Sequence, residues 1–121
     1  MKSKKTLVLG ASPNPVRFSN KAVRSLLRHQ YDVVPVGLRQ GTIEGKEIQV
    51  GTPPVEGVHT VSLYVGPSRQ TAYFDYIISL KPARVIFNPG TVNPAFMARL
   101  EKEGIHPVNG CMLVMLNKGE F

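Results

Sequence analysis

The stretch that most constrains the fold lies near the start of the chain, at residues 7–20 (LVLGASPNPVRFSN). A short apolar run ends at Gly10, a loop of small residues and prolines follows, and a helical pattern begins near Ser19. A glycine at this point permits a tight turn and lets a phosphate approach the backbone, while the next helix presents free N–H groups. The junction therefore predicts a nucleotide-binding type of α/β fold, with a phosphate-bearing ligand at the first loop and Arg17 beside it.

Further apolar runs of strand length alternate with helical patterns along the rest of the chain. The predicted strands cover residues 6–10, 31–36, 58–65, 83–87 and 105–108, and the predicted helices cover residues 19–30, 68–80, 94–103 and 111–116. Strands and helices in this order, joined by short connections, form a parallel sheet with right-handed crossovers. We therefore expect a Rossmann-like three-layer α/β sandwich with a five-stranded, mostly parallel sheet, formed as one domain by residues 1–121.

Local signals add detail to this prediction. Ser19 or Asn20 is the expected N-cap of the first helix. Pro35 lies inside the second predicted strand and indicates an edge-like position or the end of the ladder there. The glycine-rich residues 37–50 predict a loop with a small hairpin. Tyr73 and Tyr76 share the apolar face of the predicted helix 68–80 and are expected in the core.

The carboxyl ends of the predicted strands share a turn chemistry of glycine, proline and asparagine. These ends lie at one edge of a parallel sheet, which is where ligands of open α/β folds bind. The five turns together therefore predict one binding site more strongly than any single turn does. They are Gly10, Gly37, Gly66-Pro67, Asn88-Pro89-Gly90 and Asn109-Gly110.

The charge balance indicates an anionic partner. The chain has 15 Lys and Arg against 8 Asp and Glu, a formal net charge of +7. The basic residues are scattered and no aromatic residues interleave with them, so specific nucleic-acid binding is not expected. No apolar run approaches the roughly 20 residues of a membrane span. The basic start at residues 1–5 is not followed by the apolar region of a signal peptide. A single cysteine suits a reducing compartment, so we expect a cytoplasmic protein.

The loop after Gly10 lacks the best-known nucleotide motifs. It has neither G-x-G-x-x-G nor a Walker lysine, and no acidic residue closes the second strand, which disfavours NAD. No histidine pairs with a nucleophile or carboxylate at a readable spacing, and no carboxylate follows a strand, so no catalytic residue is predicted. Cys111 follows the last strand, at the expected start of a helix, where its thiol would be more reactive. Two alternatives to a non-catalytic binding protein stay open. One is an enzyme that acts on an acyl-CoA or a disulfide through Cys111, and the other is an NAD-type nucleotide-binding protein.

The chain resembles the CoA-binding domain family. This family contains small stand-alone bacterial proteins similar to the N-terminal domain of the succinyl-CoA synthetase alpha subunit. The resemblance extends from Thr6 to Leu116 and rests on the order and spacing of several short pieces. They are residues 8–15 followed by Arg17 and Ser19, residues 31–36, residues 43–46, the turn at 65–68, and the turns at 88–90 and 109–112.

The resemblance implies a domain that binds coenzyme A without catalysing a reaction, since the synthetase's phosphorylated histidine belongs to a second domain. The phosphates would lie at the first loop, the adenosine end beside the residues after the second strand, and the pantetheine arm between the later turns. The family usually has Val-Asn-Pro after the second strand, whereas this chain has Val36-Gly37-Leu38. CoA or acyl-CoA is the expected partner, and a homodimer is possible for a sheet with a free edge. The residues expected to bind the cofactor are Gly10, Ala11, Ser12, Pro13, Arg17, Phe18, Ser19, Val36, Gly37, Arg39, Val65, Gly66, Ser68, Asn88, Pro89, Gly90 and Cys111.

Overall fold

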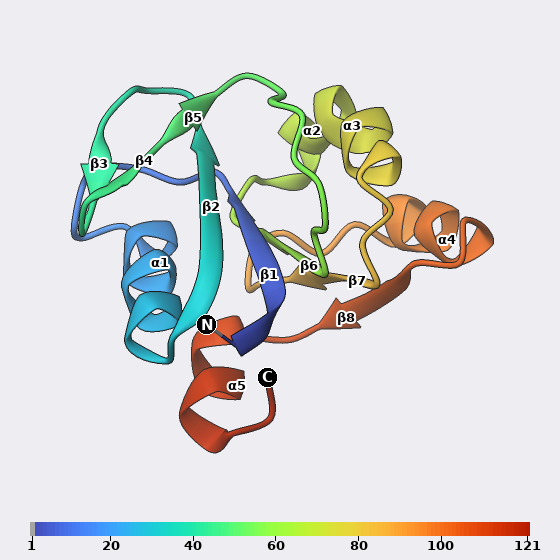
Figure 1. The fold of residues 1–121 in the computed structure, drawn as a ribbon. Helices are drawn as coiled ribbons and strands as arrows, with labels where there is room; N and C mark the ends of the chain where they lie inside the picture. Colours follow the sequence, from blue (N-terminus) through green and yellow to red (C-terminus); the bar gives the residue numbers. More distant parts are fainter. Residues whose placement is uncertain (1) are drawn as a thin grey trace.

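A computed structural model describes residues 2–121; Met1, the first residue of the basic start, lies outside the described residues. A parallel sheet runs through the middle of the protein in the order β5-β2-β1-β6-β7-β8, and β3 and β4 form a separate antiparallel hairpin (Figure 1). The strands are β1 Lys2–Leu9, β2 Tyr31–Gly37, β3 Thr42–Ile43, β4 Lys46–Glu47, β5 Gln49–Val50, β6 Thr60–Leu63, β7 Arg84–Phe87 and β8 His106–Asn109. The predicted Rossmann-like α/β fold is confirmed.

The sheet has six strands rather than the five predicted, because the two-residue β5 joins its edge. A strand this short leaves no alternating pattern in the sequence, so only the hairpin of residues 37–50 could be predicted. β5 pairs with β2 at Val36 and Gly37 only. Pro35, which pairs with Val8 of β1, lies just before this pairing begins. β2 therefore has a neighbour on both sides only at Val36 and Gly37. At Pro35 the β5 side of the strand is open, so the missing N–H of the proline costs no ladder hydrogen bond.

The helices cover both faces of the sheet (Figure 1). Alternate residues of β1 point to opposite faces: Leu7 and Leu9 pack with α3 and α4, whereas Val8 packs with α1 and α5. Each face thus has its own buried core, as expected for three layers. The helical segments are α1 Phe18–Arg28, α2 Pro67–Gln70, the 3-10 turn η1 Thr71–Tyr73, α3 Phe74–Ser79, α4 Pro94–Lys102 and α5 Met112–Lys118.

Two expectations about the helices are wrong in detail. Arg17 is the N-cap of α1 and no side chain caps it, whereas Ser19 and Asn20 lie buried inside the first turn. The single helix expected over residues 68–80 is divided into α2, η1 and α3. Tyr73 and Tyr76 are partly buried and pack against the core as expected, and Tyr73 also lines the cleft described below.

The two ends of the described chain lie close together (Figure 1). The Lys4 ammonium donates to the Phe121 main-chain oxygen at 2.5 Å. The Phe121 ring is 7% exposed and packs edge-on against Tyr31, with the Arg84 guanidinium 4.4 Å from its centroid. Phe121 thus belongs to the core that α1 and α5 cover. Within residues 2–121, no helix is both long enough and apolar enough to cross a membrane.

Candidate functional site

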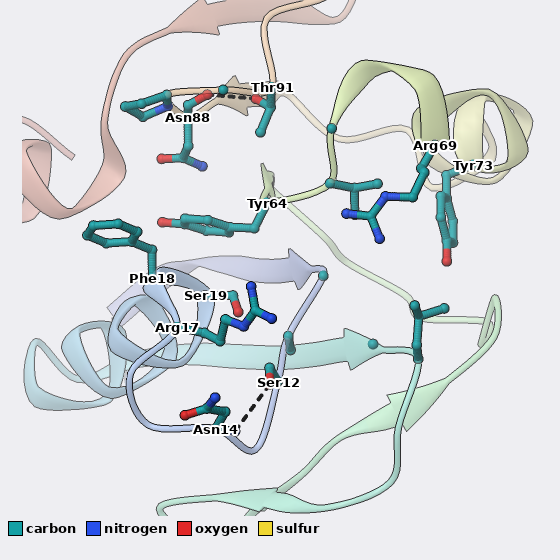
Figure 2. A pocket seen from close by; sticks show the side chains of 18 of the residues that line it. Ser12, Asn14, Arg17, Phe18, Ser19, Tyr64, Arg69, Tyr73, Asn88 and Thr91 are labelled. Carbon is teal, nitrogen blue, oxygen red and sulfur yellow. Dashed lines mark hydrogen bonds between the residues drawn. The ribbon is translucent and has the colours of Figure 1, made fainter.

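A cleft of about 920 Å³ opens at the carboxyl ends of β1 and β6. The chain leaves β1 for β2 on one side and later returns to β6 on the other, so the sheet order reverses between these two strands. In open α/β sheets the crevice at this switch point is the usual ligand site. The loop after β1 forms one wall of the cleft, and the turns after β6 and β7 form the opposite wall (Figure 2).

The structure brings most of the sequence-predicted site residues together around this cleft. All of them line it except Val36 and Ser68. Val36 is buried at the end of β2, where its carbonyl oxygen accepts hydrogen bonds from the amides of Gly10 and Ala11, both at 2.9 Å. Ser68 is exposed on α2. The cleft-lining residues that sequence reasoning did not assign to the site are Asn14, Leu38, Tyr64, Arg69, Ala72, Tyr73, Thr91 and Leu113.

The loop after β1 is shaped by its own short side chains. The main-chain N–H of Asn14 donates to Ser12 Oγ, and the main-chain N–H of Val16 donates to Asn14 Oδ1, both at 3.1 Å. Such bonds satisfy a loop backbone that forms neither helix nor strand. They leave the Arg17 side chain exposed at the cleft wall, directly before α1.

Two residues of α1 hold this loop from behind. Asn20 is 3% exposed and donates through Nδ2 to the Ser12 carbonyl at 2.9 Å. Its Oδ1 accepts from Arg24 Nε at 2.8 Å, and Arg24 Nη2 donates to the Pro15 carbonyl at 3.0 Å. Neither side chain lines the cleft. We call Asn20 and Arg24 the loop clamp, because they tie both ends of the loop to the helix.

The main-chain N–H groups that are free to bind an anion come from the helix rather than from Gly10. The amides of Gly10 and Ala11 are already bonded to Val36. In the first turn of α1 the N–H groups of Phe18, Ser19 and Asn20 have no intrahelical acceptor, because an α-helix leaves its first donors free. These donors and the helix dipole favour a negative group beside Ser19.

Two glycines allow the wall of the cleft to close tightly on the β2 side. A Cβ at Gly37 would overlap the Ala11 carbonyl oxygen, and a Cβ at Gly41 would lie 2.9 Å from Pro13 Cβ. Glycine at these positions therefore permits the loop after β1 to pack directly on the chain that follows β2. An asparagine at position 37 would not fit this packing, because its Cβ would overlap the Ala11 carbonyl oxygen.

The charge around the cleft is entirely positive. Arg17 precedes α1, Arg39 follows β2 and Arg69 lies on α2; all three are exposed and line the cleft. Arg17 and Arg69 extend from opposite walls toward the space between them (Figure 2). Among the described residues no aspartate, glutamate or histidine lines the cleft. This arrangement focuses positive potential on a single concave surface.

A buried polar network fixes the opposite wall. Asn88 donates through Nδ2 to Ser62 Oγ and to the Leu63 carbonyl, and its Oδ1 accepts from the Met112 amide at 2.9 Å. Gln70, fully buried, donates to the carbonyls of Val65 and Thr91. These amides join the turns after β6 and β7 to the start of α5. A fully satisfied buried network of this kind is rigid.

Tyr64 and Cys111 also line the cleft. Burial raises the pKa of the Tyr64 hydroxyl, so the phenol is neutral at physiological pH. Cys111 is a free, half-buried thiol at the N-cap of α5, as its position in the sequence predicted. Within residues 2–121 no three His, Cys, Asp or Glu side chains are grouped to hold a metal ion.

Comparison with known proteins identifies the family. The family model described as a CoA binding domain matches residues 4–117. The chain belongs to the CoA-binding domain family. The resemblance predicted from the strand-end turns is thus confirmed over nearly the whole chain. No curated protein matches it.

Solved structures of similar proteins share the whole fold of this CoA-binding domain. A crystal structure of an uncharacterized protein is 47% identical, with a TM-score of 0.96 and complete coverage of both chains. A hypothetical protein from Pyrococcus horikoshii OT3 is 28% identical, with a TM-score of 0.86 over 97% of this chain and 84% of its own. A protein from Thermus thermophilus is 26% identical, with a TM-score of 0.87 over 98% of this chain and 91% of its own.

Proposed function

We propose that the protein binds coenzyme A or an acyl-CoA in this cleft and does not itself catalyse a reaction. The observation that carries the proposal is the convergence of Arg17, Arg39 and Arg69 on a cleft without acidic lining. CoA carries about four negative charges, on a diphosphate and a separate 3′-phosphate. Membership of the CoA-binding domain family supports the choice of CoA among polyanionic ligands.

The diphosphate would lie at the first turn of α1, between Ser19 and the Arg17 guanidinium. The adenosine end would lie toward Gly37 and Arg39, beyond the end of β2. The pantetheine arm would run past Gly66 and the turn at residues 88–90 toward Cys111. This orientation places each charged part of CoA near an arginine and the uncharged arm along the polar but neutral wall.

The chemistry of the lining residues supports binding without catalysis. General acid–base catalysis needs a group that exchanges a proton near neutral pH, and the described lining residues include no histidine or carboxylate. Cys111 has no such partner in the lining of the cleft. The proposal extends to a cytoplasmic protein, because a single cysteine and a CoA ligand both suit a reducing compartment.

Calorimetric titration with CoA, dephospho-CoA, ADP and NAD tests the proposal. We expect CoA to bind most tightly, because only CoA offers both the diphosphate and the 3′-phosphate. Arg17→Ala should weaken CoA binding by roughly 1–3 kcal/mol, the range for loss of a charge-assisted hydrogen bond. Arg28→Ala is the matched control, because Arg28 is exposed near the other end of α1 and does not line the cleft.

Two results would overturn the proposal. One is the absence of binding by any CoA species up to millimolar concentration. The other is tighter binding of NAD than of CoA. If CoA binds but Arg17→Ala and Arg28→Ala behave alike, CoA binding stands and the position of the diphosphate beside Arg17 is wrong.

A further inference from the structure

The two ends of the cleft differ in chemistry. Arg69 and Tyr73 lie at one end, and Phe18 lies at the other, beyond Tyr64 (Figure 2). The Arg17 side chain points away from Phe18, toward the Arg69 side (Figure 2). The positive charges therefore surround one part of the cleft and leave the other part without a charged lining residue.

The uncharged end is apolar and open. Phe18 is 66% exposed, although it is a large aromatic residue on the first turn of α1. Leu113, on the first turn of α5, also lines the cleft, and α1 and α5 pack against each other. An exposed apolar surface that continues a binding cleft marks a place where an apolar group is bound. We call Phe18 and Leu113 the apolar shelf.

We propose that the ligand of this protein is an acyl-CoA with an uncharged, non-polar acyl group, and that this group packs on the apolar shelf. The inference rests on the proposed function, which places the pantetheine arm toward Cys111 and the sulfur end of CoA near the shelf. An acyl group on that sulfur would continue in the same direction, away from the arginines. Free CoA would leave the Phe18 ring largely exposed.

One nearby positive charge favours a competing kind of acyl group, one that ends in a carboxylate. The Lys21 ammonium lies 5.1 Å from the centroid of the Phe18 ring. Lys21 is exposed and does not line the cleft, and its ammonium forms a cation–π pair with the Phe18 ring. A dicarboxylic acyl group, such as succinyl, could instead reach this ammonium. Its binding is therefore measured as a separate arm of the test.

The experiment compares the dissociation constants of CoA, octanoyl-CoA and succinyl-CoA for the intact protein. Each fully buried methylene favours binding about fourfold. We expect octanoyl-CoA to bind at least tenfold more tightly than CoA, and succinyl-CoA to gain little. Equal affinities for CoA and octanoyl-CoA would overturn the inference and leave the proposed function intact. Tighter binding of succinyl-CoA than of octanoyl-CoA would also overturn it.

A pair of exposed substitutions tests the location. Phe18→Ser should remove most of the gain from octanoyl-CoA, measured as the ratio of the dissociation constants of CoA and octanoyl-CoA for the same variant. Val16→Ser is the matched control, because Val16 is 75% exposed in the loop just before α1 and does not line the cleft. If both variants keep the full gain, the acyl group does not lie on the shelf, and the inference fails. If no CoA species binds, the proposed function itself fails.

Discussion

At the scale of single residues, Gly37 shows how closely the loop after β1 is fitted to the end of β2. Its backbone has no positive φ, so conformational freedom is not the reason for glycine here. The reason is space, since a Cβ would overlap the Ala11 carbonyl oxygen. The asparagine that is usual in the family would require the loop to move.

We therefore predict that Gly37→Ala lowers the free energy of unfolding by roughly 1–3 kcal/mol, the usual cost of overpacking a tight site. It should also weaken CoA binding, because the displaced loop leads directly into Arg17. Gly66→Ala is the control within the same cleft: Gly66 has φ −63° and a Cβ there meets nothing within 4 Å. Urea denaturation of the two variants checks this, and equal stabilities would contradict the packing argument.

At the scale of elements, the loop clamp decides how well the binding loop is ordered before ligand arrives. Asn20→Ala removes the hydrogen bond to the Ser12 carbonyl and the acceptor of Arg24 Nε. We expect a weaker affinity for CoA although neither residue lines the cleft. Because the two side chains act together, Asn20→Ala and Arg24→Ala should be non-additive in a double-mutant cycle of binding. Additive losses would mean that each residue acts alone.

The salt dependence of binding separates this role from a direct contact. A guanidinium that meets a phosphate contributes a screened charge interaction, so removing it reduces the effect of salt on affinity. Arg17→Ala should reduce that salt dependence, whereas Asn20→Ala should leave it unchanged. A salt dependence that Asn20→Ala reduces as much as Arg17→Ala would contradict the positioning role.

The elements also show how far sequence reasoning extends. Strands β1, β6 and β7 could be predicted because each is a short apolar run closed by turn residues. The same turn residues also predicted most of the lining of the cleft. Arg69 and Tyr73 could not be assigned to it, because the apolar spacing of residues 68–80 suits one continuous helix. The break at η1 depends on tertiary packing and leaves no periodic signal in the sequence.

At the scale of the whole molecule, the partly buried His59 couples stability to pH. Burial, together with the positive charges of Arg84 and Lys4, lowers the pKa of His59 below its usual 6.5. His59 Nδ1 lies 2.8 Å from Thr60 Oγ1, which also accepts a hydrogen bond from Arg84 Nε, so the imidazole lies close to a positive charge. Below pH 6.5 the unfolded chain therefore binds a proton that the folded protein resists.

The free energy of unfolding should accordingly fall as the pH drops through 6.5 toward the lowered pKa of His59, and it should be higher at pH 7.5 than at pH 5.5. His59→Gln should reduce this dependence. His106→Gln, at an exposed histidine at the start of β8, is the control variant. Denaturation at a series of pH values provides the measurement, and an unchanged pH dependence in His59→Gln would count against the assignment.

The molecule as a whole is a rigid sheet whose switch-point edge carries a positively charged cleft, and the central claim is that CoA binds there. Backbone amide shifts of the isotopically labelled protein, followed by NMR during titration with CoA, test binding and location together. We expect saturable shifts at Ser12, Ser19, Gly66 and Gly90, with the start of β8 and the region around Phe121 unaffected. Saturable shifts confined to the Lys4–Phe121 end of the molecule, or no shifts at millimolar CoA, would contradict it.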